Sequence, residues 1–208
     1  ITSSFSDDVY LSKEIALGFS FPFYGKAYDR VYISSFGGIA FNNGENVYRS
    51  PLTETAYGLD GVAYISAYGY ELAFGPESKV EYAKKDGKFV VNYSNVMALV
   101  YDQDYTPISF RIVLSSNGDI EVYYDSYEAA SLFQSGSTLY CGIHDPEDAD
   151  PLTVTSADVA DYWGNNDDPA GDVYNYFTSQ TAVRFVAPKA SFITGITPAY
   201  GIINPGDK

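Results

Sequence analysis

The chain has 208 residues, 46% of them hydrophobic, with 21 Tyr and 13 Phe. This much apolar surface can offset the entropy lost on ordering the chain, which excludes intrinsic disorder. The formal net charge of -15 argues against nucleic acid and anionic membranes as partners, and the lone Cys141 excludes an internal disulfide and a multi-cysteine zinc site.

The chain carries no sign of a membrane span or of a leader. No apolar run approaches the roughly 20 residues that a spanning helix needs. The opening residues, "ITSSFSDD", lack the basic start and apolar stretch of a signal peptide. We therefore expect no membrane insertion, and a soluble piece of a longer precursor.

Short segments rich in Val, Ile, Tyr and Phe, separated by Gly, Asn, Asp and Pro, predict an all-β protein. In the first segment Phe19, Phe21 and Phe23 alternate, so their shared face should pack between two sheets. Pro22 and Gly25 should end this strand at an edge or a turn. The following stretches "RVYISSF" and "GGIAF" predict two strands with a tight joint.

Two hairpins are expected next. In "KVEYAKKDGKFVVNYSNV", Asp86-Gly87 suits the positive φ angles of a type I′ turn. Asn117-Gly118 repeats this pattern between "ISFRIVLSS" and "DIEVYYDS". The first of these strands should direct four alternating side chains into the core: Ile108, Phe110, Ile112 and Leu114.

The later part of the chain mixes strands with a long insertion. Residues 124–136 are the best candidate for one short helix, and "STLYCGIHD" and "QTAVRFVAP" predict strands. The polar residues 145–180 between those strands predict an irregular insertion that carries function or covers a sheet edge. We expect an antiparallel β-sandwich of jelly-roll-like connectivity over residues 1–188, followed by a linker at 189–208.

A family resemblance rests on an ordered set of blocks. These are "LGFSFPFYGKAYDRVYISSFGGIAF", "KFVVNYSNV", "SFRIVLSSNGDIEVYY", "CGIHDPEDADPLTVTS" and "AVRFVAP". Together they resemble an extracellular β-sandwich accessory module of secreted multidomain bacterial peptidases and surface proteins. The "FPFYG" block also resembles nidogen-like and plexin-domain-like modules, and "ITPAYGIINPGDK" resembles the opening of an Ig-like repeat. The resemblance implies a secreted or cell-surface, non-catalytic module beside other domains of the same polypeptide, and it supplies no catalytic residue.

The composition allows few combinations of catalytic residues. His144 is the only histidine, so a Ser-His-Asp or Cys-His set must use it. Cys141 lies three residues away and would point to the opposite face of a continuous strand. Acid pairs such as Asp102 with Asp104, or Asp145 with Glu147, could hydrolyse a glycoside only at a separation that the fold decides. We therefore expect no enzymatic activity.

Two acidic clusters could hold a structural calcium ion, because carboxylates on turn-forming backbone are the oxygen ligands that calcium prefers. Neither cluster matches the EF-hand loop, and we favour solvated acidic turns over a calcium site. The candidate ligands are Asp145, Glu147, Asp148 and Asp150 in "DPEDADP", and Asp167, Asp168 and Asp172 in "NNDDPAGD".

Two tyrosine-rich runs could bind a ligand, since Tyr and Trp rings offer flat apolar faces to sugars and proteins. Strand tyrosines that pack their rings inward are the alternative. The candidates are Tyr68 and Tyr70 in the first run and Tyr162, Trp163 and Tyr174 in the late insertion. The sequence thus predicts a module that binds an extracellular protein or a glycan, with a calcium-assisted carbohydrate-binding module as the alternative.

Overall fold

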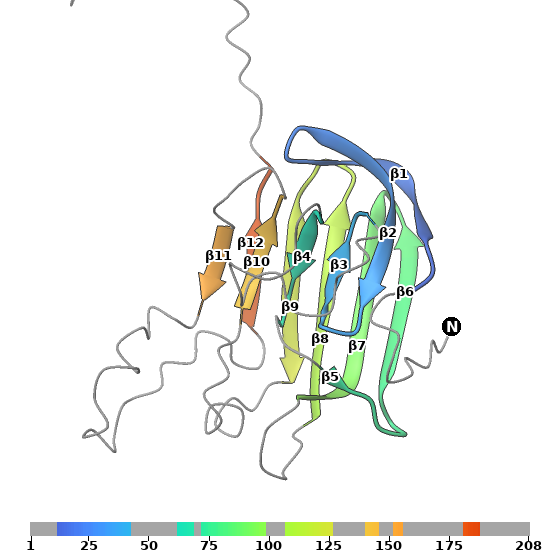
Figure 1. The fold of residues 1–208 in the computed structure, drawn as a ribbon, viewed down its shortest axis with the longest axis vertical. Coiled ribbons are helices and arrows are strands. Elements are labelled where there is room, and N and C mark those ends of the chain that lie inside the picture. The colour runs from blue at the N-terminus through green and yellow to red at the C-terminus, as the bar shows by residue number, and fades with distance from the viewer. Residues whose placement is uncertain are drawn as a thin grey trace, which may run out of the picture.

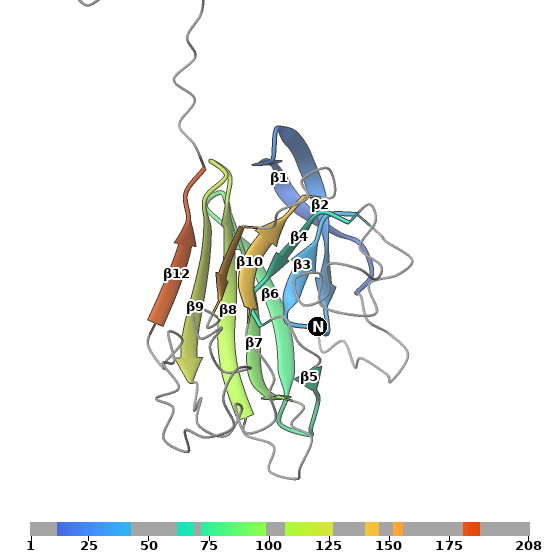
Figure 2. The same cartoon turned by 60° about the vertical axis from the view of Figure 1, so that its left-hand side comes forward.

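The computed structural model describes residues 12–42, 62–68, 72–98, 107–126, 140–145, 152–155 and 181–187. Its strands form two antiparallel sheets that pack face to face (Figures 1 and 2). The first sheet consists, in spatial order, of β1 (Ile15–Phe23), β2 (Lys26–Ser34), β3 (Gly38–Ala40), β4 (Tyr64–Ser66), β10 (Tyr140–His144) and β11 (Leu152–Thr155). The second consists of β12 (Thr181–Phe185), β9 (Ile120–Ser126), β8 (Pro107–Ser115), β7 (Lys88–Ala98) and β5 (Leu72–Ala73), with β6 (Lys79–Lys85) also paired to β7.

The predicted β-sandwich is therefore confirmed. Among the described strands, consecutive ones pair from β1 to β4, from β6 to β9 and from β10 to β11, and the chain crosses between sheets after β4, β9 and β11. The described ranges contain no helix, and Tyr124, expected to open one, lies in β9. Residues 127–136 lie outside the described part. Within the described residues, no helix is long and apolar enough to span a membrane.

The core lies between the sheets and is rich in aromatic rings. Phe21 and Phe23 are 0% and 4% exposed, and Phe19 packs partly buried against the same cluster, so the shared face of β1 is confirmed as core. Pro22 lies on this edge strand, where its missing N–H costs no ladder hydrogen bond. The four alternating residues of β8, from Ile108 to Leu114, are buried as expected.

The turns follow local chemistry with one exception. Asp86 and Gly87 have φ of 51° and 71°, which confirms the type I′ hairpin between β6 and β7. In the second hairpin only Gly118 has a positive φ, of 92°. Its N–H donates to the Ser115 carbonyl at 2.8 Å, and the Ser115 N–H donates to the Asp119 carbonyl at 2.9 Å. The expected type I′ turn is thus wrong: the loop is a three-residue turn with a glycine bulge.

Two buried tyrosine hydroxyls join the second sheet to the first. Tyr93 of β7 donates to the carbonyl oxygens of Ser34 at 2.7 Å and of Gly38 at 3.0 Å. Tyr124 of β9 donates to the carbonyl oxygen of Ala67 at 2.5 Å. Burial raises the pKa of Tyr93 well above its ordinary value, so its hydroxyl stays protonated and remains a donor.

Candidate functional site

Most of the predicted site residues lie outside the described part of the chain. These are Tyr70, Tyr162, Trp163 and Tyr174 among the aromatic candidates, and Glu147, Asp148, Asp150, Asp167, Asp168 and Asp172 among the acidic ones. Their roles stay predictions. Tyr68 and Asp145 are placed by the structure.

Tyr68 is a core residue, so its expected role as an exposed platform is wrong. Its side chain is 4% exposed, and its ring stacks on Phe110 with centroids 6.4 Å apart. A Cβ added to Gly37 would lie only 2.7 Å from the Cβ of Tyr68, so the two residues pack tightly together. A ring enclosed in this way offers no face to a ligand at the surface.

Asp145 lies at the end of β10 and belongs to an ion pair. Its side chain is 4% exposed, and its Oδ1 lies 3.9 Å from the Nζ of Lys26 at the start of β2. The pair links the end of β10 to the β1–β2 hairpin. Within the described ranges, no three His, Cys, Asp or Glu side chains gather closely enough to hold a metal ion.

Cys141 and His144 do not form a catalytic pair. Cys141 is 0% exposed and belongs to the main core, and Ile143, on the same face of β10, packs partly buried against that core. His144 lies on the opposite face of β10 and pairs in register with Tyr64. Burial raises the pKa of the Cys141 thiol to about 12. The thiol is therefore protonated at neutral pH and is a poor nucleophile. The predicted opposite orientation of the two side chains is confirmed.

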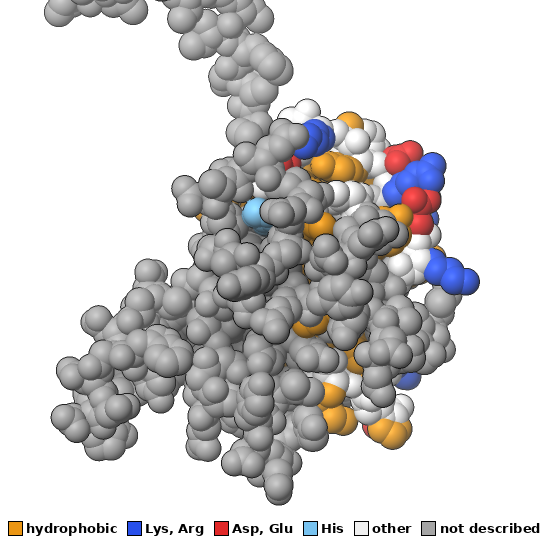
Figure 3. Space-filling view, viewed as in Figure 1, with side chains coloured by type: hydrophobic (Ala, Val, Ile, Leu, Met, Phe, Trp, Pro, Cys, Tyr) orange, Lys and Arg blue, Asp and Glu red, His pale blue; other side chains and the backbone are white. Residues whose placement is uncertain are grey.

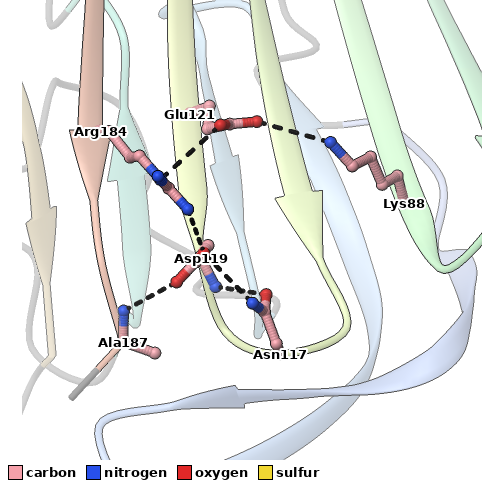
Figure 4. Close-up of polar contacts among 6 residues, drawn as sticks. All are labelled: Lys88, Asn117, Asp119, Glu121, Arg184 and Ala187. Atoms are coloured by element: carbon pink, nitrogen blue, oxygen red, sulfur yellow. Dashed lines mark hydrogen bonds and ion pairs between the residues drawn. The ribbon is translucent and has the colours of Figure 1, made fainter. Parts of the chain in front are cut away.

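A polar network that the sequence does not reveal lies beside the β8–β9 turn (Figure 4). The Arg184 guanidinium of β12 donates to Asp119 Oδ2 at 2.6 Å, and the Ala187 N–H donates to Asp119 Oδ1 at 3.2 Å. Asn117 Nδ2 also donates to Asp119 Oδ2, at 3.1 Å. The hydrogen bond from Arg184 is the main cause that lowers the pKa of Asp119, and burial opposes it. Asp119 thus holds the end of β12 against the turn.

The network continues across the outer face of the second sheet. Glu121 Oε1 lies 3.7 Å from Arg184 Nε, and Glu121 Oε2 lies 3.7 Å from Lys88 Nζ on β7 (Figure 4). Because Asp119 and Arg184 are 65 residues apart, only the strand order brings them together. The one local signal was Asn-Gly-Asp, in which Asn and Asp side chains commonly bond to a turn.

One end of the sandwich brings several of these elements together, and we call it the hairpin end. It consists of the β1–β2 hairpin, the β8–β9 turn, Asp145 and residues 186–187 after β12 (Figure 1). A Cβ on Gly118 would lie 2.8 Å from Ala187 Cβ and 3.0 Å from Pro22 Cγ, so these three residues are in close contact. Glycine is required there by both space and its positive φ.

The hairpin end carries exposed apolar side chains beside charged ones. Tyr24 at the tip of the β1–β2 hairpin is 39% exposed and Val186 is 58% exposed. Lys26 and Arg184 supply exposed positive charge nearby. Figure 3 shows hydrophobic, basic and acidic side chains together at the top of the molecule. This combination of an aromatic ring, an aliphatic side chain and charges is typical of a binding surface.

Sequence comparison relates this sandwich to a family. A family model described as NIDO related matches residues 1–183. The chain belongs to the NIDO-related family. The match agrees with the nidogen-like resemblance of the "FPFYG" block, which forms the end of β1 and the β1–β2 turn of this NIDO-related domain. No curated protein and no solved structure matches the chain.

Proposed function

We propose that this NIDO-related domain is a non-catalytic extracellular interaction module of a secreted or surface multidomain protein. The family match over residues 1–183 carries the proposal, because NIDO-like domains are typically extracellular. The module would act beside neighbouring domains of the same polypeptide, including a peptidase. Its ligand would be an extracellular protein, bound through surface complementarity.

The hairpin end supports this role and supplies the residues that would contact the ligand. Tyr24 has φ of 46°, in the left-handed region, at the tip of the two-residue turn between β1 and β2, and its side chain is 39% exposed. Phe23 contacts the Tyr24 ring edge-on, with centroids 4.9 Å apart. A pre-oriented, half-exposed tyrosine loses little conformational entropy on binding, which is a property of interface anchors.

The test is a binding screen of the purified domain against extracellular proteins, followed by mutation of the hairpin end. We expect Tyr24→Asn with Val186→Ser to weaken binding at least tenfold while the melting temperature stays within about 2 °C, because both side chains are exposed. Asn tolerates the positive φ of position 24. Leu152→Ser is the matched control, since Leu152 is 55% exposed on β11. Equal loss of binding in the control, or none in the double variant, would refute the assignment.

A carbohydrate-binding module is the second candidate, and the exposed ring of Tyr24 favours it, because a half-exposed ring beside charged groups can stack on a sugar. In such a module Trp163, Tyr162 and Tyr174 would supply further aromatic rings, and the acidic clusters within residues 145–150 and 167–172 would bind calcium. Retention on polysaccharides, measured with calcium and again with a chelator, separates the candidates. Saturable retention lost in Trp163→Ala would favour the carbohydrate module, whereas a folded protein silent on all sugars would favour the protein ligand.

A further inference from the structure

The open edge of the second sheet is a described feature that the proposed function does not use. β6 pairs with β7 on one side, and no described strand pairs with its other side (Figure 1). The edge of a sheet presents unpaired backbone donors and acceptors, to which another strand can bond. We call the side of Lys79–Lys85 that faces away from β7 the β6 edge.

The β6–β7 turn decides which residues present these groups. Lys85 and Lys88 close a two-residue type I′ turn, so they form a hydrogen-bonded pair, and bonded pairs alternate along the ladder with pairs that are not bonded. The N–H and C=O groups of Val80, Tyr82 and Lys84 therefore point away from β7. Within the described residues, no hydrogen bond joins these groups to another strand or loop.

The β6 edge is basic although the chain is acidic. β6 holds three lysines and one glutamate, which gives this strand a net charge of +2, whereas the whole chain carries -15. Lys79, Lys84 and Lys85 are exposed, and none of them forms an ion pair with a described residue. Charges are screened over about 8 Å at physiological salt, so a ligand on this edge interacts with these lysines more strongly than with acids elsewhere on the chain.

The inward side chains of β6 change from apolar to basic along the strand. Val80 is 5% exposed, and the Tyr82 ring stacks on Phe89. Lys84 follows on the same face, with its Nζ 5.9 Å from the centre of the Tyr82 ring. A strand added beside β6 would therefore meet apolar side chains beside Val80 and Tyr82 and a lysine beside the turn.

A second copy of the chain fits this edge poorly. Antiparallel pairing of two β6 strands over their full length places Tyr82 opposite Tyr82 and Lys79 opposite Lys85 at both ends. Like charges directly opposite each other destabilise a strand pair, and lysines on edge strands commonly prevent such association. A strand with acidic residues at these positions would be attracted instead.

We propose that the β6 edge binds an extended acidic segment of a partner protein, which adds to the second sheet as an antiparallel strand. The backbone groups of Val80, Tyr82 and Lys84 bond to the segment, and the lysines select its charge. The segment carries apolar residues opposite Val80 and Tyr82 and acidic residues opposite the three lysines. This binding does not depend on the ligand of the hairpin end, because β6 contributes no residue to that surface.

The test titrates the full chain, at 0.15 M salt, into the labelled peptide Glu-Glu-Thr-Val-Thr-Val-Glu and follows fluorescence anisotropy. In the antiparallel register, the peptide residues lie in turn opposite Lys85 to Lys79. We expect saturable binding below about 1 mM protein. A peptide with lysines in place of the three glutamates should bind at least roughly fivefold more weakly, because opposite charges across a strand pair become like charges.

Two N-methylated peptides separate strand addition from attraction through charge alone. An N-methyl group on the valine opposite Tyr82 removes a donor that faces β6 and should weaken binding roughly tenfold. The same group on the threonine opposite Ala83 faces away from β6 and should leave binding nearly unchanged. Hydrogen exchange locates the contact: the amides of Val80, Tyr82 and Lys84 should become protected when the peptide binds.

Variants of the chain test the lysines. Lys84→Glu and Lys85→Glu should each weaken binding of the acidic peptide at least roughly fivefold and strengthen binding of the lysine peptide. Their melting temperatures should stay near that of the wild type, because both side chains are exposed. Lys13→Glu, the same change on an exposed residue that precedes β1, is the control and should bind the acidic peptide nearly as the wild type does.

The remaining outcomes overturn the proposal. Absence of saturable binding at about 1 mM would show that the lysines only keep the edge unpaired. Equal binding of the acidic and the lysine peptide would exclude selection by charge. Equal loss of binding from both N-methyl groups, or amides of β6 that stay unprotected, would place the peptide on another surface.

Discussion

The hydroxyl of Tyr93, in the middle of β7, lies 2.7 Å from the carbonyl oxygen of Ser34, at the last residue of β2 in the opposite sheet. A single side chain thus spans the core and adds a second donor to a buried backbone oxygen at the β2–β3 turn, which also accepts from the Gly37 N–H at 3.3 Å. A buried hydrogen bond of this kind contributes about 1 kcal/mol to stability, and this one ties the two sheets together at one point.

Tyr93→Phe should lower the free energy of unfolding by about 1–2 kcal/mol, because the carbonyl oxygens of Ser34 and Gly38 lose their shared buried donor. Urea denaturation followed by fluorescence measures the change. Tyr82→Phe is the matched control: Tyr82 is only partly buried and stacks on Phe89. An unchanged midpoint for Tyr93→Phe would show that the hydroxyl contributes nothing net.

Gly38→Ala should destabilise the domain by about 3 kcal/mol or more, since a Cβ there would lie 2.2 Å from Tyr64 Oη and 2.4 Å from the Ile65 backbone oxygen. The backbone oxygen cannot rotate away. Gly25→Ala is the control, because nothing lies within 4 Å of its Cβ and only its φ of 75° opposes the substitution, at about 1–2 kcal/mol. In thermal unfolding, Gly38→Ala should have a much lower melting temperature than Gly25→Ala. The reverse order would contradict the close approach of Tyr64 and Ile65 to Gly38.

Acid should loosen the β8–β9 turn through Asp119. Arg184 lowers the pKa of Asp119 in the folded state, so the stabilisation is fully present above the ordinary carboxyl pKa and is lost as pH falls through the folded value. Asp119→Asn should therefore have a lower melting temperature than the wild type at pH 7. The difference in melting temperature between the two proteins should shrink as the pH falls from 4 to 2. Melting temperatures across this range measure both effects. The control is Asp86→Asn in the β6–β7 turn, and a constant gap between Asp119→Asn and wild type would contradict the ion pair.

Cys141 should resist thiol reagents in the native state. With its pKa raised to about 12 by burial, the thiolate is scarce at pH 8 and the sulfur is enclosed. We expect labelling by a disulfide reagent to take place only on unfolding, with a rate that rises steeply in denaturant. Rapid labelling of the native protein would mean that β10 opens on its own.

Local signals were enough for most of the sandwich. The alternation of apolar side chains correctly predicted the buried face of β8 and the core role of Phe21 and Phe23. Every second side chain of a strand points to the same face of the sheet, so apolar residues at this spacing mark the buried face. Asp86-Gly87 was read correctly, since its own residues decide the turn. Asn117-Gly118 was not, because the side chains of Asn117 and Asp119 bond to each other and to β12 and thereby favour a longer turn.

The candidate site was harder to predict. Tyr68 lies in a tyrosine-rich run in which spacing does not show which ring faces the core, and the fold decided in favour of burial. A turn was expected at Gly25, but the positive φ of Tyr24 was not, because tyrosine rarely adopts a positive φ and its residue type gives no signal for a type I′ turn. The Asp119–Arg184 pair depends on strand order, which no local pattern encodes.

The pairing of β12 with β9 also governs how the domain assembles. Thr181 pairs with Tyr124, so the edge of β9 stays open until more than fifty further residues of the chain have been made. Sheets closed by such distant partners fold slowly, on a scale of about milliseconds to seconds, and an open edge can pair with the wrong strand meanwhile. The Arg184 contact with Asp119 gives the late strand an anchor in the right register, which shortens the time that the nascent domain is vulnerable to aggregation.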